Sequence, residues 1–158
     1  MKRWSEKIEI NAPIDEVWKL VDGSLEDMQK ITPNLMENEP IKVTDEGVGS
    51  IYKQSFKVGP RFQTFEVKTL QYENEPEYKK QQFSYVHGGV FRITTTYELK
   101  KLSDQTTLFH YQTQTKPLKW YLGLFMLISR GSSIAKRFVR HVKKVAERDM
   151  LPSTSDHE

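Results

Sequence analysis

Between Asn38 and Thr115 the chain is a succession of six strand-like runs joined by links that are too short to hold a crossover helix. Parallel neighbours in a sheet need a connection of about a dozen residues or more, so each run must pair antiparallel with the next one. An alternating run at Lys7–Ile10 brings the expected number of strands to seven. The six later runs are Ile41–Thr44, Ser50–Val58, Phe62–Tyr72, Lys79–Val86, Val90–Lys100 and Thr106–Thr115.

Alternation of polar and apolar residues along these runs predicts a sheet with one face on a core and the other in water. Tyr52 and Phe56 share one face of their run, as Phe83 and Tyr85 do of theirs. The last run allows either face inside, and we place its aromatic residues on the core rather than the set that contains His110. The residues expected to face water are Lys53, Lys57, Arg92, Thr94, Thr96 and Glu98.

Helical spacing marks the segments on either side of the strands. After the first strand, an apolar stripe that includes Val17 and Trp18 predicts a helix with Pro13 at its start. Ser24 and Asp27 have the spacing of a capping box and predict a second, short helix directly afterwards. We expect Val17 and Trp18 to seal one end of the sheet.

The C-terminal part of the chain returns to helical periodicity. A short helix is expected within Leu118–Ile128, and a longer one over Ser132–Met150, which would be about 28 Å long. The apolar stripe of the longer helix is Ile134, Ala135, Phe138, Val142, Val145 and Ala146. Its opposite side carries the cations Lys136, Arg137, Arg140, Lys143, Lys144 and Arg148.

Length and charge bound the organisation of the protein. With 158 residues we expect one domain over 1–151, followed by a polar, disordered tail over 152–158. The net charge of +3 is uneven, because 15 basic and 17 acidic residues precede Lys116, whereas 9 basic and 2 acidic residues lie between Lys116 and Leu151. The absence of cysteine excludes disulfide scaffolds and thiol chemistry and fits a cytoplasmic protein. No signal peptide or membrane-spanning stretch is expected.

The order of these elements resembles the helix-grip fold of the START-like superfamily (SRPBCC), which groups polyketide cyclases, birch-pollen-allergen-like proteins and lipid-transfer domains. The stretch Ile10–Asp22, with the sequence INAPIDEVWKLVD, is similar to the opening signature of that group, of which this chain resembles a bacterial-type member. Gly47–Ser50 before a strand and the apolar-then-basic final helix are similar to it as well. The resemblance implies an α+β chain whose curved, seven-stranded antiparallel sheet wraps around a long C-terminal helix and encloses an apolar cavity.

A ligand cavity needs a mostly apolar lining with a few polar groups, and the inward positions of the strands supply aromatic side chains that would line it or simply fill the core. Gln54 is the informative exception, because a buried amide needs hydrogen-bond partners and a ligand hydroxyl or carbonyl could be one. The predicted lining residues are Tyr52, Gln54, Phe56, Phe65, Phe83, Tyr85, Phe91, Tyr97, Phe109, Tyr111 and Phe138.

Motifs for catalysis or metal binding are missing from the sequence. No two histidines have metal-ligand spacing, so we expect neither a metal nor a cofactor. There is no nucleophile elbow and no phosphate-binding glycine loop. Glu66 and Glu98 could act as acid or base only if buried, and alternation places Glu98 outside. No catalytic residue is identified, and the sequence favours a binding protein over an enzyme.

Three functions remain open from the sequence. The favoured one is binding, transport or sequestration of an apolar or amphipathic small molecule between the sheet and the C-terminal helix. The second is a cyclase- or dehydratase-like reaction on a polyketide-type substrate. The third is a peripheral membrane or protein-interaction module that uses the basic C-terminal helix, with the aromatic residues of Trp120–Ile128 and the cations beside them as an interfacial anchor. Nucleic acid is not expected as a partner, and the chain is expected to be a monomer or a weak dimer.

Overall fold

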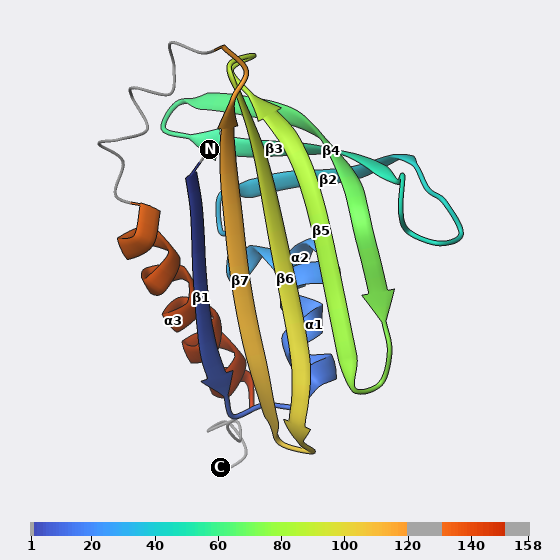
Figure 1. Ribbon diagram of the computed structural model, residues 1–158, viewed down its shortest axis with the longest axis vertical. Helices are drawn as coiled ribbons and strands as arrows, with labels where there is room; N and C mark the ends of the chain where they lie inside the picture. Colours follow the sequence, from blue (N-terminus) through green and yellow to red (C-terminus); the bar gives the residue numbers. More distant parts are fainter. Residues whose placement is uncertain (1, 120–130, 151–158) are drawn as a thin grey trace, which may run out of the picture.

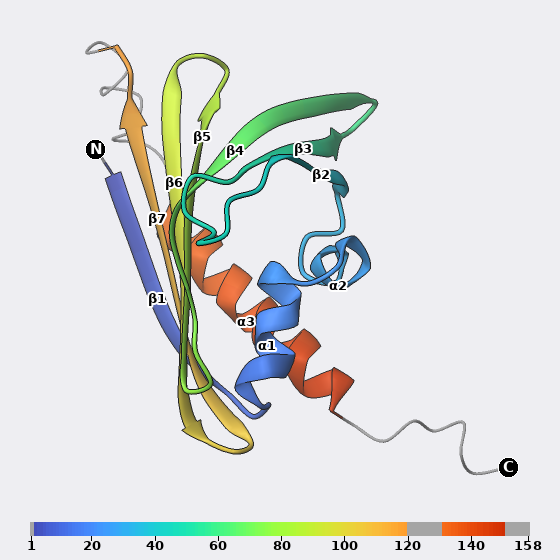
Figure 2. The same ribbon diagram turned by 90° about the vertical axis from the view of Figure 1, so that its right-hand side faces the viewer.

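A single antiparallel sheet carries the fold, and the helices pack on its concave face (Figures 1 and 2). The computed structural model describes residues 2–119 and 131–150. Its elements are β1 (Lys2–Ile10), α1 (Ile14–Asp22), α2 (Leu25–Gln29), β2 (Leu35–Lys42), β3 (Ile51–Val58), β4 (Arg61–Asn74), β5 (Tyr78–His87), β6 (Phe91–Ser103), β7 (Thr106–Pro117) and α3 (Gly131–Asp149). This is the seven-stranded helix-grip arrangement that the sequence predicts.

The strand order is β1-β7-β6-β5-β4-β3-β2, so β2 to β7 form a meander and β1 pairs with the last strand. The chain therefore leaves β1 at one edge of the sheet and enters β2 at the other edge. Helices α1 and α2 make that crossing over the concave face, below the bent β2–β4 part of the sheet (Figure 2). This connection positions the end of α1 against the middle strands.

Local sequence explains the two crossing helices. The apolar stripe of α1 is buried, with Val17 fully covered and Trp18 7% exposed. Two acidic residues lie in its first turn, where the helix dipole favours negative charge. In α2 the Ser24 hydroxyl accepts a hydrogen bond from the Asp27 backbone N–H at 3.1 Å, which confirms the predicted cap.

The second strand lies elsewhere than predicted. The sequence places a strand at Ile41–Thr44, whereas β2 begins at Leu35 and ends at Lys42. Pro40 and the acidic residues before it argue against a central strand, but β2 is an edge strand, and an edge tolerates a residue without a backbone N–H. Pro40 pairs opposite Tyr52 of β3, next to a register shift.

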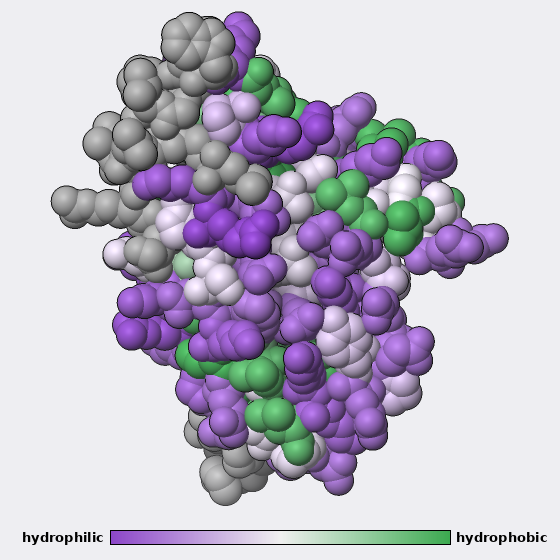
Figure 3. Space-filling view, in the orientation of Figure 1, coloured by the Kyte–Doolittle hydropathy of each residue, from purple (hydrophilic) through white to green (hydrophobic). Residues whose placement is uncertain are grey.

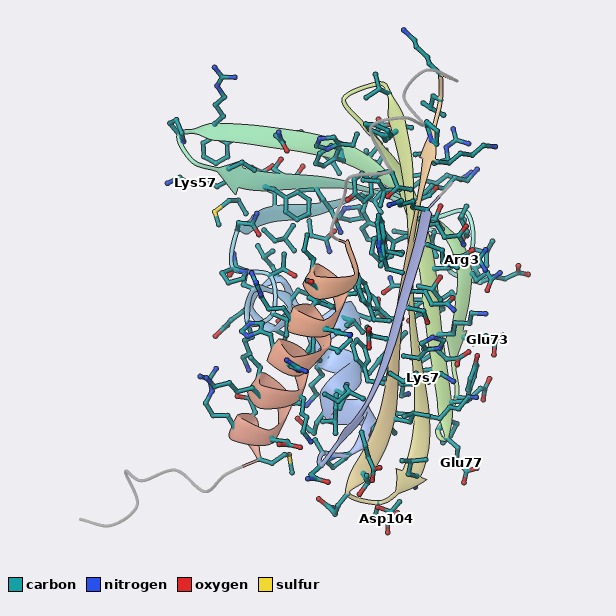
Figure 4. The ribbon with its side chains drawn as sticks, turned by 60° about the vertical axis from the view of Figure 1, so that its left-hand side comes forward. Arg3, Lys7, Lys57, Glu73, Glu77 and Asp104 are labelled. Atoms are coloured by element: carbon teal, nitrogen blue, oxygen red, sulfur yellow. The ribbon has the colours of Figure 1, made fainter. Side chains whose placement is uncertain are left out.

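The two faces of the sheet differ as expected. Phe109 is fully buried on the inner face, which confirms the register chosen for the last strand, while His110 lies on the outer face. The outer face is mostly polar (Figure 3), and Arg3, Lys7 and Glu73 point away from the helices (Figure 4).

One outward position departs from the prediction. Thr96 was expected in water, yet it is 6% exposed. Its hydroxyl accepts a hydrogen bond from the Gln82 amide on the neighbouring strand at 3.0 Å. Side chains on adjacent strands therefore cover one another even on the polar face.

Helix α3 packs along β1 and buries Ala135, Val139 and Val142 (Figure 1). Ile134 was predicted in this stripe but is 64% exposed, although its neighbour Ala135 is buried, so the buried face of α3 begins at Ala135. The predicted helix within Leu118–Ile128 and the tail over 152–158 lie outside the described residues, apart from the first residues of the former. Within the described part of the chain, no helix has both the length and the apolar character needed to cross a bilayer.

Candidate functional site

A cavity of about 320 Å³ lies between the inner face of the sheet, the end of α1, α2 and Phe138 of α3. This volume is within the range of small-molecule sites, near its lower end. One wall is aromatic, another comes from the aliphatic residues of α1, α2 and β2, and polar side chains are interspersed. The lining residues are Leu20, Val21, Asp22, Gly23, Met28, Ile31, Thr32, Leu35, Asn38, Tyr52, Gln54, Phe56, Val67, Thr69, Gln81, Phe83, Tyr85, Thr95, Tyr97, Tyr111 and Phe138.

Most of the aromatic residues named from the sequence lie on this wall. Tyr97 is at its centre, with ring centroids 5.7 Å from Phe83, 5.8 Å from Tyr111 and 6.1 Å from Phe138. These rings come from three neighbouring strands and from α3. The predicted residues that the structure places along the cavity are Tyr52, Gln54, Phe56, Phe83, Tyr85, Tyr97, Tyr111 and Phe138.

Three predicted residues do not line the cavity. Phe109 is fully buried in the core beneath Tyr97, with ring centroids 6.0 Å apart. The ring of Phe65 packs against Phe56 and Tyr85, and these two rings rather than Phe65 form the wall. Phe91 lies at the first position of β6, opposite Pro117, beyond the cavity. Alternation identifies the inner face but not how far along each strand the cavity extends.

Gln54 lies on the wall, and its amide already has a protein partner. Its Nε2 donates a hydrogen bond to Asn38 Oδ1 at 3.2 Å, across the β2–β3 pair. The need for a partner that the sequence indicates is therefore met in part by the edge strand.

Beside the cavity lies a polar cluster that sequence reasoning did not identify, formed by Asp22 and Gln81, which line the cavity, and by Tyr72, which does not. The Tyr72 hydroxyl donates to Asp22 Oδ2 at 2.6 Å, and the Gln81 amide Nε2 lies 3.4 Å from Asp22 Oδ1. Tyr72, Gln81 and Tyr97 are direct cross-strand neighbours on β4, β5 and β6, so their side chains share the inner face. The cluster joins the end of α1 to the middle of the sheet.

Burial dominates the electrostatics of this cluster. It raises the pKa of the Asp22 carboxyl, against hydrogen bonds from Tyr72 and Trp18 and the charge of Lys79, which lower it. Burial and the hydrogen bond to Asp22 together raise the pKa of Tyr72 to about 12. Tyr72 therefore keeps its proton at neutral pH and serves as the donor in this pair.

Gln81 Oε1 is the one buried side-chain polar atom of the described residues that has no hydrogen-bond partner. Such an atom costs roughly 1–3 kcal/mol when it stays unpaired. Two sequence signals could have found the cluster. Asp22 is four residues after Trp18 on the same helix face, and Gln81 is two residues before Phe83 on the same strand face.

The other residues considered for chemistry lie away from the cavity. His110 contacts Ser5 on the outer face, with 2.6 Å between Nε2 and Oγ. Glu98 is on that face as predicted and accepts a hydrogen bond from the Tyr78 hydroxyl at 2.6 Å. Glu66 is exposed, so it lacks the burial that an acid or base role would need. Among the described residues, no three His, Asp or Glu side chains gather as a metal site would require.

Comparison with known proteins identifies the fold. No family model and no curated protein matches this sequence. The di-domain ARO/CYC protein BexL of the BE-7585A biosynthetic pathway matches with a TM-score of 0.74 at 16% identity, over 96% of this chain and 48% of BexL. The chain thus spans about half the length of that protein.

Two further structures of similar length match almost throughout. A START superfamily protein from Mycobacterium smegmatis has a TM-score of 0.65 at 14% identity and covers 93% of this chain and 95% of its own. Norcoclaurine synthase from Thalictrum flavum, in complex with dopamine and hydroxybenzaldehyde, has a TM-score of 0.60 at 19% identity and covers 96% of this chain and 89% of its own. Identities this low show the fold alone, and the fold is the START-like helix grip.

Proposed function

We propose that this protein binds an amphipathic small molecule in the cavity between the sheet, α1, α2 and Phe138. The observation that carries the proposal is a cavity of about 320 Å³ whose wall combines aromatic rings with the polar cluster of Asp22 and Gln81. A concave site of this volume with a largely apolar lining and a few polar groups is typical of small-molecule binding sites. By binding this ligand, the protein would serve in its transport or sequestration.

The lining suits a ligand with an apolar body and a few polar groups. Phe83 and Phe138 offer apolar area, while burial raises the pKa of Tyr85, Tyr97 and Tyr111, so that these phenols stay protonated. Protonated phenols can donate hydrogen bonds to a ligand without a buried charge. The proposed ligand is therefore neutral over most of its surface.

The proposal is tested by native mass spectrometry of the purified protein, followed by a screen of fatty acids, sterols and flavonoid-like compounds. A cavity-filling variant makes the test specific. Thr95 is 7% exposed and lines the cavity, so Thr95→Phe should abolish retention of any ligand. Thr94→Phe is the control, because it adds the same ring to the opposite face of the same strand.

Ligand retained equally by wild type and Thr95→Phe would contradict the proposal. Absence of any stoichiometric ligand across the screen would contradict it as well. Circular dichroism of both variants checks that they are folded.

A second candidate function is catalysis by proton transfer. It is favoured by one observation, a cavity-lining carboxyl of raised pKa that is hydrogen-bonded to a tyrosine. In this scheme Asp22 exchanges a proton with the substrate while Tyr72 orients the carboxyl. Mutation separates the two candidates: Asp22→Asn should lower a reaction rate by orders of magnitude, whereas it should weaken simple binding only modestly.

A further inference from the structure

We propose that the ligand of this cavity carries a hydroxyl group that donates a hydrogen bond to Gln81 Oε1, beside the Asp22 carboxyl. The inference rests on the proposed function, because it names the chemistry of a ligand in the same cavity. It assigns the ligand's orientation too, with the hydroxyl at the polar cluster and the apolar body against the aromatic wall.

The polar cluster has more hydrogen-bond acceptors than donors. A carboxylate can accept about four hydrogen bonds, and Asp22 already receives the Tyr72 hydroxyl on Oδ2, one long contact of 3.4 Å from Gln81 on Oδ1 and the Trp18 side chain. Gln81 Oε1, one amide group away, receives none. Gln81 Oε1 therefore has free lone pairs that only a donor can satisfy. This oxygen is covered by protein although its residue lines the cavity, so the amide turns toward the ligand to accept the bond.

A hydroxyl fits this cluster better than the other polar groups that a small molecule could present. A ligand carbonyl would add another acceptor to a site that already lacks donors. A cationic group would be redundant, since the charge of Lys79 already acts on the Asp22 carboxyl. A neutral hydroxyl supplies the missing donor without burying a further charge.

The position of Gln81 in the sheet determines where the rest of the ligand lies. Its direct cross-strand neighbour is Tyr97, whose ring is 5.7 Å from that of Phe83. A hydroxyl held by Gln81 therefore places the adjoining atoms over these two rings. The cavity of about 320 Å³ is about twice the size of an apolar cavity that accepts benzene, so a two-ring hydroxyarene is a suitable probe.

The test compares three probes of almost equal shape, 2-naphthol, 2-methoxynaphthalene and naphthalene, by isothermal calorimetry at neutral pH. The methoxy compound keeps the oxygen as an acceptor but has no proton to donate. We expect wild type to bind 2-naphthol about tenfold more tightly than 2-methoxynaphthalene. A tenfold difference in affinity corresponds to the free energy of one hydrogen bond to a charged or otherwise unpaired acceptor.

Two variants locate the hydroxyl. Gln81→Met keeps the length of the side chain and removes the acceptor, so the preference for 2-naphthol should fall to about onefold while naphthalene still binds. Gln54→Met is the matched control, because Gln54 also lines the cavity but has its own partner in Asn38. We expect it to keep the tenfold preference.

The outcomes separate this inference from the proposed function. Equal binding of all three probes to wild type would overturn the hydroxyl assignment and leave the proposed function standing. Failure of all three to bind, at concentrations up to their solubility, would count against the proposed function as well. A preference that survives in Gln81→Met but disappears in Gln54→Met would overturn the location. The wild-type comparison stands even if a variant does not fold.

Discussion

Replacement of Trp18 by alanine should remove a large part of the stability of this protein. Trp18 is 7% exposed on α1, its ring centroid is 6.1 Å from that of Tyr72, and the Lys79 ammonium lies 6.0 Å from the ring. Truncation of a buried aromatic of this size costs about 3–5 kcal/mol, because the surrounding side chains close the cavity only in part. Domains of this kind have a total stability of about 5–15 kcal/mol.

The assay is thermal and urea unfolding followed by circular dichroism. For a domain of 158 residues, a loss of 3–5 kcal/mol corresponds to a fall in Tm of about 6–20 °C, with little change in the urea m value. Trp4→Ala is the control, since Trp4 is a half-buried residue on the edge strand β1 and its removal should cost less. Trp18→Phe should be intermediate, because it keeps a ring against Tyr72.

The same substitution connects stability to the site. Trp18 packs against Tyr72, whose hydroxyl holds Asp22, so its loss should loosen the polar cluster and weaken ligand binding too. A soluble Trp18→Ala protein with an unchanged Tm would refute the reasoning. It would mean that this residue does not close the core as its burial indicates.

Two further predictions concern charged groups outside the cavity. Burial and the charge of Lys7 lower the pKa of His110. The folded protein therefore binds a proton at His110 less readily than the unfolded chain does. The stability that this difference contributes is present above the usual pKa of 6.5 and is lost as the pH falls through the lowered pKa. Unfolding midpoints between pH 5 and pH 8 should therefore vary less in His110→Gln than in wild type. The control is His141→Gln, which removes an exposed histidine. A His110→Gln protein with the same pH profile as wild type would contradict this prediction. Reversal of the exposed Lys136 and Arg137 to glutamate should leave sedimentation with anionic liposomes unchanged, with neutral liposomes as reference. If these cations instead guide the protein to a membrane, at about 1 kcal/mol each, the double reversal would weaken association more than tenfold.

The sequence was most informative where local rules act. Short links between the strand-like runs require antiparallel neighbours, and the observed meander from β2 to β7 follows them. The spacing of Val17 and Trp18 predicts a buried helix face, and Ser24 caps α2 as its spacing with Asp27 predicts. These features depend on residues close together in the chain, so a pattern of period two or of about 3.6 is enough to show them.

Local rules failed where position within the sheet matters. Pro40 disfavours a strand in general, yet it is tolerated because β2 is at the edge, and strand order is a property of the whole sheet. Phe65 and Phe109 face inward as alternation requires but do not line the cavity, since alternation carries no information on how far the sheet bends around the helices.

The candidate site shows most clearly which features the sequence determines and which features only the tertiary structure decides. The sequence by itself determined an inner face rich in aromatic residues, because each strand alternates independently of the others. Only the tertiary structure decided that Asp22, Tyr72 and Gln81, which lie far apart in the chain, meet at one place beside the cavity. Their meeting depends on the crossing of α1 over the sheet and on the register between β4 and β5. Long-range geometry of this kind is absent from any single segment, and so is the unpaired, covered oxygen of Gln81 that it leaves beside the cavity.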